Sequence, residues 1–183
     1  PYYNKPSQEG LYQHFKVIAD SSPVPVILYN VPGRTASNIT AETTLRLASH
    51  PNITGIKEAS GNLEQCMRII RDKPRDFLLI SGDDMMTVPL YAIGAKGVIS
   101  VLANAYPVIF RKIKEYSLEG NYSKATQEAL KILDINPLMY EESNPVGLKT
   151  LLEEMGICTG AVRLPLVQAS ESLRSRIRSL GKK

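Results

Sequence analysis

Four short, largely apolar segments alternate with helix-forming segments, and this alternation limits the fold more than any other feature of the chain. The segments read VPVILYN, ITGIK, FLLIS and KGVISV at residues 24–30, 53–57, 77–81 and 96–101. They are too continuously apolar to keep one face in water, which is typical of strands buried on both faces. Strands that alternate with helices predict an α/β fold in which helices cover a parallel sheet.

The residues that follow these segments carry helix signals. Thr40 and Asn62 precede amphipathic stretches and can cap them, because their side-chain oxygens accept hydrogen bonds from free backbone N–H groups. Pro107 fits the first position of a later helix, and Gly94 fits the position just after the helix predicted at residues 85–93. An earlier helix, before the first strand, is predicted by an apolar stripe of Leu11, Phe15, Ile18 and Ala19.

The alternation of strands and helices ends at residue 119, and only helical segments follow. Three of them are predicted, at residues 122–135, 145–155 and 168–180. Pro145 suits the first turn of its helix, and Asn144 before it suits the capping position. We therefore predict two domains, a strand–helix domain at residues 1–119 and a helical domain at residues 120–183.

Four strand–helix units cannot close a (β/α)8 barrel, which needs eight units and typically about 250 residues. The units therefore form either a small open sheet or the second half of a barrel whose first strands are absent from this chain. The chain begins at Pro1 and not at methionine. We expect that an upstream segment has been removed or left out.

The composition, 43% apolar and 22% charged residues, is that of an ordinary soluble globular protein. No apolar run approaches the roughly 18 to 20 residues that a membrane span requires. The net charge of +4 is mild, and its only concentration, at residues 174–183, indicates a solvated helix face more readily than a nucleic-acid site. Cys66 and Cys158 are isolated, which argues against zinc and disulfides and favours a reducing cytoplasm.

The carboxyl ends of the predicted strands carry the chemically interesting side chains, as expected for parallel α/β folds. Lys57 ends an otherwise apolar strand, and Tyr29 has the matching place on the preceding strand. Neighbouring strands lie about 4.8 Å apart, so an amine and a phenol there can share one pocket. Imine chemistry needs an amine whose pKa burial lowers from about 10.4 and a partner that passes protons. The alternatives are a lysine that reaches solvent and a core tyrosine bonded to backbone.

Charged residues that follow the first and third predicted strands are candidates for binding roles. Arg34 follows in a Pro-Gly turn, where its guanidinium can hold a substrate carboxylate or simply face solvent. Asp83 and Asp84 resemble a metal-binding pair, but adjacent residues point apart and no histidine accompanies them. Carboxylates at a helix start are the favoured interpretation. The sequence contains no glycine-rich phosphate loop and no Ser/His/Asp set, so no metal and no bound cofactor are predicted.

Five motifs in unbroken order resemble the dihydrodipicolinate synthase family. They read PYYNKPSQEG, YNVPGRT, GIKEA, SGDD and GVIS at residues 1–10, 29–35, 55–59, 81–84 and 97–100. Each motif is weak alone, but together they are specific and span essentially the whole chain. The resemblance implies the second half of a (β/α)8 TIM barrel followed by a C-terminal helical domain. It also implies a lyase that condenses pyruvate with L-aspartate 4-semialdehyde to 4-hydroxy-tetrahydrodipicolinate, in lysine and diaminopimelate biosynthesis.

The resemblance implies catalytic roles for three residues. Lys57 would form the Schiff base with pyruvate, without any other cofactor. Tyr29 would shuttle protons over the imine and the enamine. Tyr3 would be inserted by a neighbouring subunit to complete a proton relay, which implies a homo-oligomer, either a tetramer or a dimer.

Binding roles follow from the same resemblance. Arg34 would hold the carboxylate of the semialdehyde, and Gly82 and Ile99 would line the pyruvate pocket. Tyr2 would belong to a lysine feedback site in those family members that have one. The threonine pair that binds the pyruvate carboxylate would lie upstream of Pro1, so residues 1–183 alone are expected to be inactive.

Three other functions remain as alternatives. N-acetylneuraminate lyase and the keto-deoxy-sugar acid aldolases share the lysine and the tyrosine, but Arg34 and the Tyr2–Tyr3 pair favour a short carboxylated aldehyde. A non-catalytic relative is the second alternative, although binding alone does not require an amine beside a phenol. An unrelated open-sheet phosphate binder is the third, and it would need a glycine loop that is missing.

Overall fold

The computed structural model describes residues 1–181, which divide into two compact units. The first unit is Pro1–Ile99, and the second begins at Ser100. The sequence-based boundary after residue 119 uses a different criterion, the end of the strand pattern, and stays a prediction. No helix in the described part of the chain is both long and apolar enough to cross a membrane.

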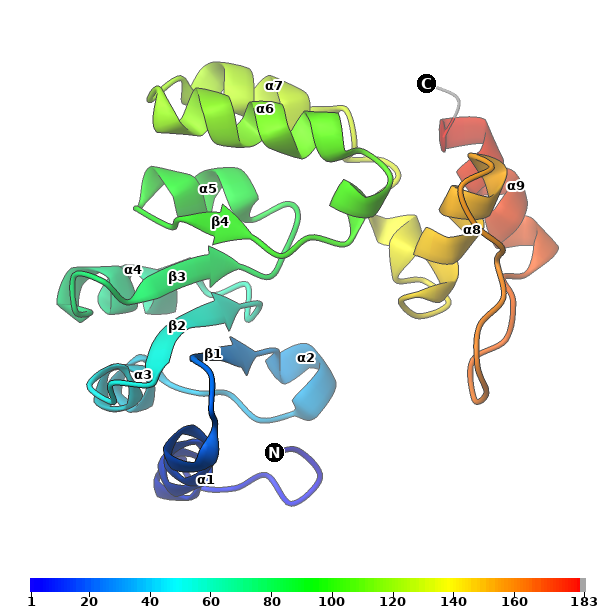
Figure 1. Cartoon of the computed structure of the whole chain (residues 1–183). Coiled ribbons are helices and arrows are strands. Elements are labelled where there is room, and N and C mark those ends of the chain that lie inside the picture. The colour runs from blue at the N-terminus through cyan, green and yellow to red at the C-terminus, as the bar shows by residue number, and fades with distance from the viewer. Residues whose placement is uncertain (182–183) are drawn as a thin grey trace. The chain divides into compact units, whose positions relative to one another are not determined.

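The first unit contains a parallel four-stranded sheet in the order β1-β2-β3-β4. In Figure 1 the four arrows lie side by side in chain order and point the same way. The strands are β1 at Val26–Asn30, β2 at Ile53–Glu58, β3 at Leu78–Ser81 and β4 at Gly97–Val98. The predicted number, order and direction of strands are confirmed, although β4 is shorter than predicted. Its pairing continues for one bond, from the Ile99 N–H to the Ser81 carbonyl at 2.9 Å.

The helices of the first unit are α1 at Gln8–Ser21, α2 at Pro32–Thr35, α3 at Ala41–Ala48, α4 at Leu63–Asp72 and α5 at Thr87–Ala92. Of these, α3 and α4 begin directly after their predicted capping residues. Thr40 caps α3 by accepting from the Thr43 N–H, and Asn62 caps α4 by accepting from the Gln65 N–H, as predicted. The Pro-Gly turn is in fact the short helix α2, because its proline occupies the first turn without needing an N–H donor.

The sheet has one covered face and one open face, and this asymmetry positions the site. Leu28, Ile56 and Leu79 point to the covered face and are at most 1% exposed in the core beneath the helices. Their strand neighbours Ile27 and Leu78 point the other way and are 44% and 37% exposed. Burial on both faces, as the apolar strands predicted, is therefore not found within the described residues. Apolar side chains on the open face, such as those of Ile27 and Leu78, are typical of residues that fill the interior of a barrel.

The second unit is helical. It contains the 3-10 turns η1 at Leu102–Asn104 and η2 at Pro137–Met139, and helices α6 at Pro107–Leu118, α7 at Tyr122–Leu130, α8 at Val146–Glu154 and α9 at Glu171–Gly181. In Figure 1, α6 and α7 lie side by side. Pro107 is at the first position of α6, as predicted.

Three helix boundaries of the second unit differ from the prediction. Helix α7 ends at Leu130, because turns replace the helix before Pro137. Asn144 was expected to cap α8, and this was wrong: Pro145 occupies the capping position without a side-chain bond. The Ser143 carbonyl accepts from the N–H groups of residues 146 and 147 instead. Helix α9 starts later than predicted, where the Ser170 hydroxyl accepts from the Leu173 N–H.

Candidate active site

Lys57 and Tyr29 lie next to each other at the carboxyl ends of β2 and β1. Their Cα atoms are register partners across the two strands. The Lys57 Nζ atom lies over the Tyr29 ring, 4.2 Å from the ring centroid. An ammonium in this position is attracted by the electron-rich ring face. The structure therefore brings the two predicted catalytic side chains into contact on the open face of the sheet.

Gly82, directly after β3, leaves room for the Lys57 side chain. A Cβ atom at residue 82 would come within 3.0 Å of both Cγ and Cε of Lys57, and within 2.8 Å of the Ala59 Cβ. The Gly82 N–H donates to the Glu58 carbonyl at 2.8 Å, which fixes the backbone here. Any larger residue would press on the stem of the lysine.

Ile99 belongs to the same face of the sheet as Lys57. Gly97 is the register partner of Ile80 on β3, and Ile80 is the partner of Lys57 on β2. Because alternate residues of a strand point to the same face, Ile99 also faces the open side. Its side chain is 47% exposed. Four of the predicted site residues thus come from consecutive strand ends.

Arg34 lies in α2, the short helix that directly follows β1. Its side chain is exposed, and among the described residues its guanidinium has no ion-pair partner. A free guanidinium near a strand end is available to an anion from solution. Arg34 thus follows the strand that carries Tyr29, and no carboxylate of the described residues occupies its guanidinium.

Tyr2 and Tyr3 lie in an N-terminal turn and are not brought to the Lys57–Tyr29 pair. They are 70% and 85% exposed, and the turn is closed by a 3.3 Å bond from the Lys5 N–H to the Tyr2 carbonyl. Tyr3 has a φ angle of 45°, in the left-handed region that non-glycine residues seldom adopt. Two large exposed aromatic rings in succession are suited to contact with another surface.

A buried polar pair that was not predicted lies behind Lys57 and Tyr29. Asn30 and Glu58 are the last residues of β1 and β2, register partners of each other, and only 1% and 2% exposed. The Asn30 amide nitrogen donates to both carboxylate oxygens of Glu58, at 3.2 and 3.0 Å. The Ser60 N–H donates to the same carboxylate at 2.7 Å. A carboxylate that closes an apolar strand was the signal that could have revealed it.

Two further amides complete this pair into a closed polar ring, which we define as Asn30, Glu58, Gln65 and Asn38. Gln65 donates to Glu58 at 2.9 Å and accepts from Asn38 at 2.9 Å. Asn38 in turn accepts from Asn30 at 2.8 Å. The Asn30 side-chain oxygen also accepts from the backbone N–H of Ile39 at 3.0 Å. The polar ring joins β1, β2, α4 and the segment before α3.

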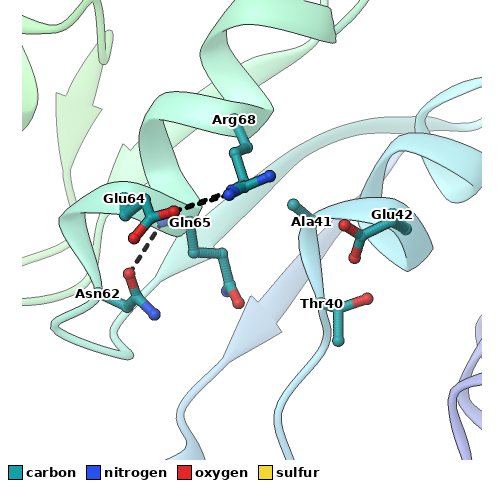
Figure 2. Close-up of a pocket in the computed structure, with 7 residues that line it drawn as sticks. All are labelled: Thr40, Ala41, Glu42, Asn62, Glu64, Gln65 and Arg68. Atoms are coloured by element: carbon teal, nitrogen blue, oxygen red, sulfur yellow. Dashed lines mark hydrogen bonds and ion pairs between the residues drawn. The ribbon is translucent and has the colours of Figure 1, made fainter.

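A surface hollow of about 250 Å³ lies between the starts of α3 and α4, outside the open face of the sheet. Its lining includes Glu42, Glu64, Gln65 and Arg68, drawn in Figure 2. Arg68 pairs with Glu64 at 2.7 Å, while Gln65 points in a different direction from the same helix. The hollow thus adjoins the polar ring but holds neither the amine nor the phenol of the candidate site.

Cys66, in α4, and Asp83, after β3, are not candidates for catalysis or metal binding. Burial raises the pKa of the Cys66 thiol to about 12, and the charge of Glu58 adds to this effect. A thiol that stays protonated is a poor nucleophile. Asp83 accepts from the N–H groups of Met85 and Met86 at 2.9 and 3.2 Å, in the turn that leads into α5. In the part of the chain that the structure describes, no group of three acidic, histidine or cysteine residues is placed to hold a metal.

The whole chain, residues 1–183, matches the family described as the dihydrodipicolinate synthetase family. One curated relative, the 4-hydroxy-tetrahydrodipicolinate synthase of Cytophaga hutchinsonii, is 55% identical over 177 residues, which are 97% of this chain and 60% of the relative. The chain spans about 60% of the length of the curated relatives it matches.

Two solved structures have closely similar folds. The chloride-inhibited dihydrodipicolinate synthase of Acinetobacter baumannii, complexed with pyruvate, has a TM-score of 0.94 and 40% identity, covering 100% of this chain and 62% of its own. The enzyme of Cyanidioschyzon merolae with lysine bound has a TM-score of 0.94 and 41% identity, covering 98% of this chain and 61% of its own. The predicted resemblance is confirmed, and so is the fold, the second half of a (β/α)8 barrel followed by a helical part.

Proposed function

Because this chain belongs to the dihydrodipicolinate synthetase family, we propose that it supplies the Schiff-base lysine of an enzyme that condenses pyruvate with L-aspartate 4-semialdehyde. The product would be 4-hydroxy-tetrahydrodipicolinate, in agreement with the name of its curated relatives. One observation carries the proposal: the Lys57 amine lies 4.2 Å from the centre of the Tyr29 ring, at the strand ends where such barrels place their chemistry.

In this proposal Lys57 attacks the carbonyl carbon of pyruvate, and loss of water leaves an imine. Loss of a proton from the pyruvate methyl carbon then gives an enamine. The enamine carbon attacks the aldehyde carbon of the semialdehyde and forms the new C–C bond. The amino group of the semialdehyde finally displaces Lys57 from the imine carbon and closes the ring. Tyr29, beside the amine, moves protons in these steps, and the imine itself replaces a cofactor as the electron sink.

The substrates are held by groups around the open face. Arg34, exposed and unpaired among the described residues, binds the carboxylate of the semialdehyde through its planar fork of donors. Gly82 and Ile99 line the pyruvate pocket beside Lys57. The close approach of Gly82 to the lysine stem supports this placement.

Tyr3 and Tyr2 act across a subunit interface in the proposed enzyme. Their exposure, 85% and 70%, supports insertion into a neighbouring subunit, where Tyr3 completes a proton relay. Tyr2 lies at a feedback site for lysine, and lysine is bound in the related Cyanidioschyzon structure. The enzyme is then a cytoplasmic homo-oligomer, a tetramer or a dimer.

The test compares reactions in a complete barrel that carries residues 1–183. We expect condensation of pyruvate with the semialdehyde and no cleavage of N-acetylneuraminate. Lys57→Arg keeps the positive charge but cannot form the imine, so condensation should fall to the uncatalysed level. Cleavage of N-acetylneuraminate, or condensation that survives Lys57→Arg, would contradict the proposal.

A further inference from the structure

The carboxylate of Glu58 is buried in an unusual way. It is 2% exposed, and among the described residues its hydrogen-bond donors are neutral: the amides of Asn30 and Gln65 and the backbone N–H of Ser60. Burying a carboxylate costs free energy that neutral donors offset less well than a cation does. Two apolar side chains at these strand ends would stabilise a buried core more than this polar pair does. Stability alone therefore does not explain the Asn30–Glu58 pair.

The location of the pair suggests what it does. Asn30 directly follows Tyr29, and Glu58 directly follows Lys57, and both pairs are in register across β1 and β2. Successive residues of a strand point to opposite faces. The Asn30–Glu58 hydrogen bonds therefore lie on the covered face, directly behind the contact between the amine and the phenol ring.

The connection between the two faces is short and stiff. One planar peptide unit links each residue of the buried pair to its neighbour on the open face. The main-chain pairing ends at the same level, with the Ala59 N–H donating to the Asn30 carbonyl at 2.9 Å. A change in the spacing or twist of the two strand ends would therefore move Tyr29 relative to Lys57.

We propose that Asn30 and Glu58 are positioning residues, whose hydrogen bonds on the covered face hold Lys57 and Tyr29 at the distance that imine chemistry requires. The inference rests on the proposed function. The polar ring strengthens it, because Gln65 and Asn38 satisfy the remaining groups and fix the rotamers of the pair. The amine and the phenol are then already in their reactive arrangement before the substrate binds.

The first variant is Glu58→Gln, in a complete barrel that carries residues 1–183. The glutamine has the same size, but its NH₂ group faces donors where the carboxylate accepted. We expect kcat for condensation to fall roughly 10-fold or more, because small misplacements of catalytic groups are costly. The KM for the semialdehyde should stay within about twofold, because Arg34 is untouched.

A second variant tests the pair itself by exchanging the roles of its members. Asn30→Asp alone places two carboxylates opposite each other and should lower kcat for condensation more than Glu58→Gln does. The double variant Asn30→Asp with Glu58→Gln again matches a donor with an acceptor across the strands, and it should recover most of the kcat. If Glu58 only stabilised the fold, its substitution would lower the thermal midpoint and leave kcat per folded enzyme unchanged, so a fall and recovery of kcat per folded enzyme at constant KM indicates a positioning role.

The control is Ile56→Val, on the same strand and the same covered face, fully buried at 0% exposure and outside the polar ring. It should lower the thermal midpoint and leave kcat unchanged. Unchanged kcat in Glu58→Gln, an equal loss in Ile56→Val, or a double variant no better than the single ones would overturn the inference.

The proposed function is checked in the same experiment by trapping pyruvate on the unsubstituted protein with borohydride. An adduct on Lys57 together with an indifferent Glu58→Gln variant would overturn the inference alone. No adduct on Lys57 would overturn the proposed function and the inference with it.

Discussion

Gly82 lies so close to the side chain of Lys57 that a larger residue at position 82 would displace the lysine. A Cβ at residue 82 would approach both Cγ and Cε of the lysine to 3.0 Å. The Ala59 Cβ, at 2.8 Å, blocks the other direction. The glycine is thus needed for space rather than for its backbone freedom, and the lysine keeps its place over the Tyr29 ring because residue 82 has no side chain.

Gly82→Ala should therefore displace the amine without unfolding the protein. A shift of about 1 Å at a catalytic group can cost roughly 100-fold in rate, and we expect a loss of that order in imine formation. Rapid-quench trapping with pyruvate measures it. The matched control is Gly33→Ala, where an added Cβ meets nothing within 4 Å. Equal rates in both variants would show that the lysine stem simply moves aside.

The fold was largely predictable because local signals agreed with the tertiary structure. The apolar segments that end at Asn30 and Lys57 became neighbouring parallel strands, and the caps Thr40 and Asn62 form as predicted. Pairing of Lys57 with Tyr29 also followed, since both stand at the same level of adjacent strands. The helix caps depend on residues close in sequence, whereas the Lys57–Tyr29 pairing depends on the order of the strands and on their two-residue period.

Features that depend on distant contacts were not predictable. The polar ring links Asn30 to Gln65 through Asn38, and a single sequence gives no sign of the hydrogen bond between Asn38 and Gln65, which are far apart in the chain. Asn144 failed as a cap because the carbonyl of Ser143 accepts from the first two N–H groups of α8. Burial of both sheet faces was expected from the continuous apolar pattern of the strands, but Ile27 and Leu78 on the open face have no covering layer among the described residues.

Arg34→Ala should reduce the use of the semialdehyde far more than that of pyruvate. Loss of a charge-assisted hydrogen bond costs about 1.5 to 3 kcal/mol, which corresponds to roughly 10- to 150-fold in kcat/KM for that substrate. Arg34→Lys should recover only part of the loss, because an ammonium lacks the planar fork. Equal effects on both substrates would assign a different role to Arg34.

The Cys66 thiol should stay unreactive in the folded protein and make stability fall at alkaline pH. Its pKa of about 12 lies above the unfolded value of about 8.5, so the unfolded chain loses this proton first as the pH rises. Stability is therefore retained below pH 8.5 and declines towards pH 12, by about 1 to 2 kcal/mol at pH 10. Urea unfolding of the unsubstituted protein and of Cys66→Ala should show this decline only in the former. Parallel pH profiles would contradict the assignment.

Residues 1–183 expressed alone should be aggregation-prone and inactive. Tyr29, Ile27 and Leu78 are 46%, 44% and 37% exposed on the open face, and the outer edge of β1 has no strand partner among the described residues. Exposed apolar faces and unpaired edges favour association. Thermal unfolding, light scattering and condensation should be compared with a complete barrel. A soluble, cooperative and active chain would contradict this prediction.

The most direct measurement is reduction with borohydride in the presence of pyruvate, followed by peptide mass analysis of a complete barrel that carries these residues. The proposed chemistry predicts one carboxyethyl adduct, and it predicts the adduct on Lys57, the amine that lies 4.2 Å from the Tyr29 ring centre. An adduct on another lysine, or none at all, would contradict the account.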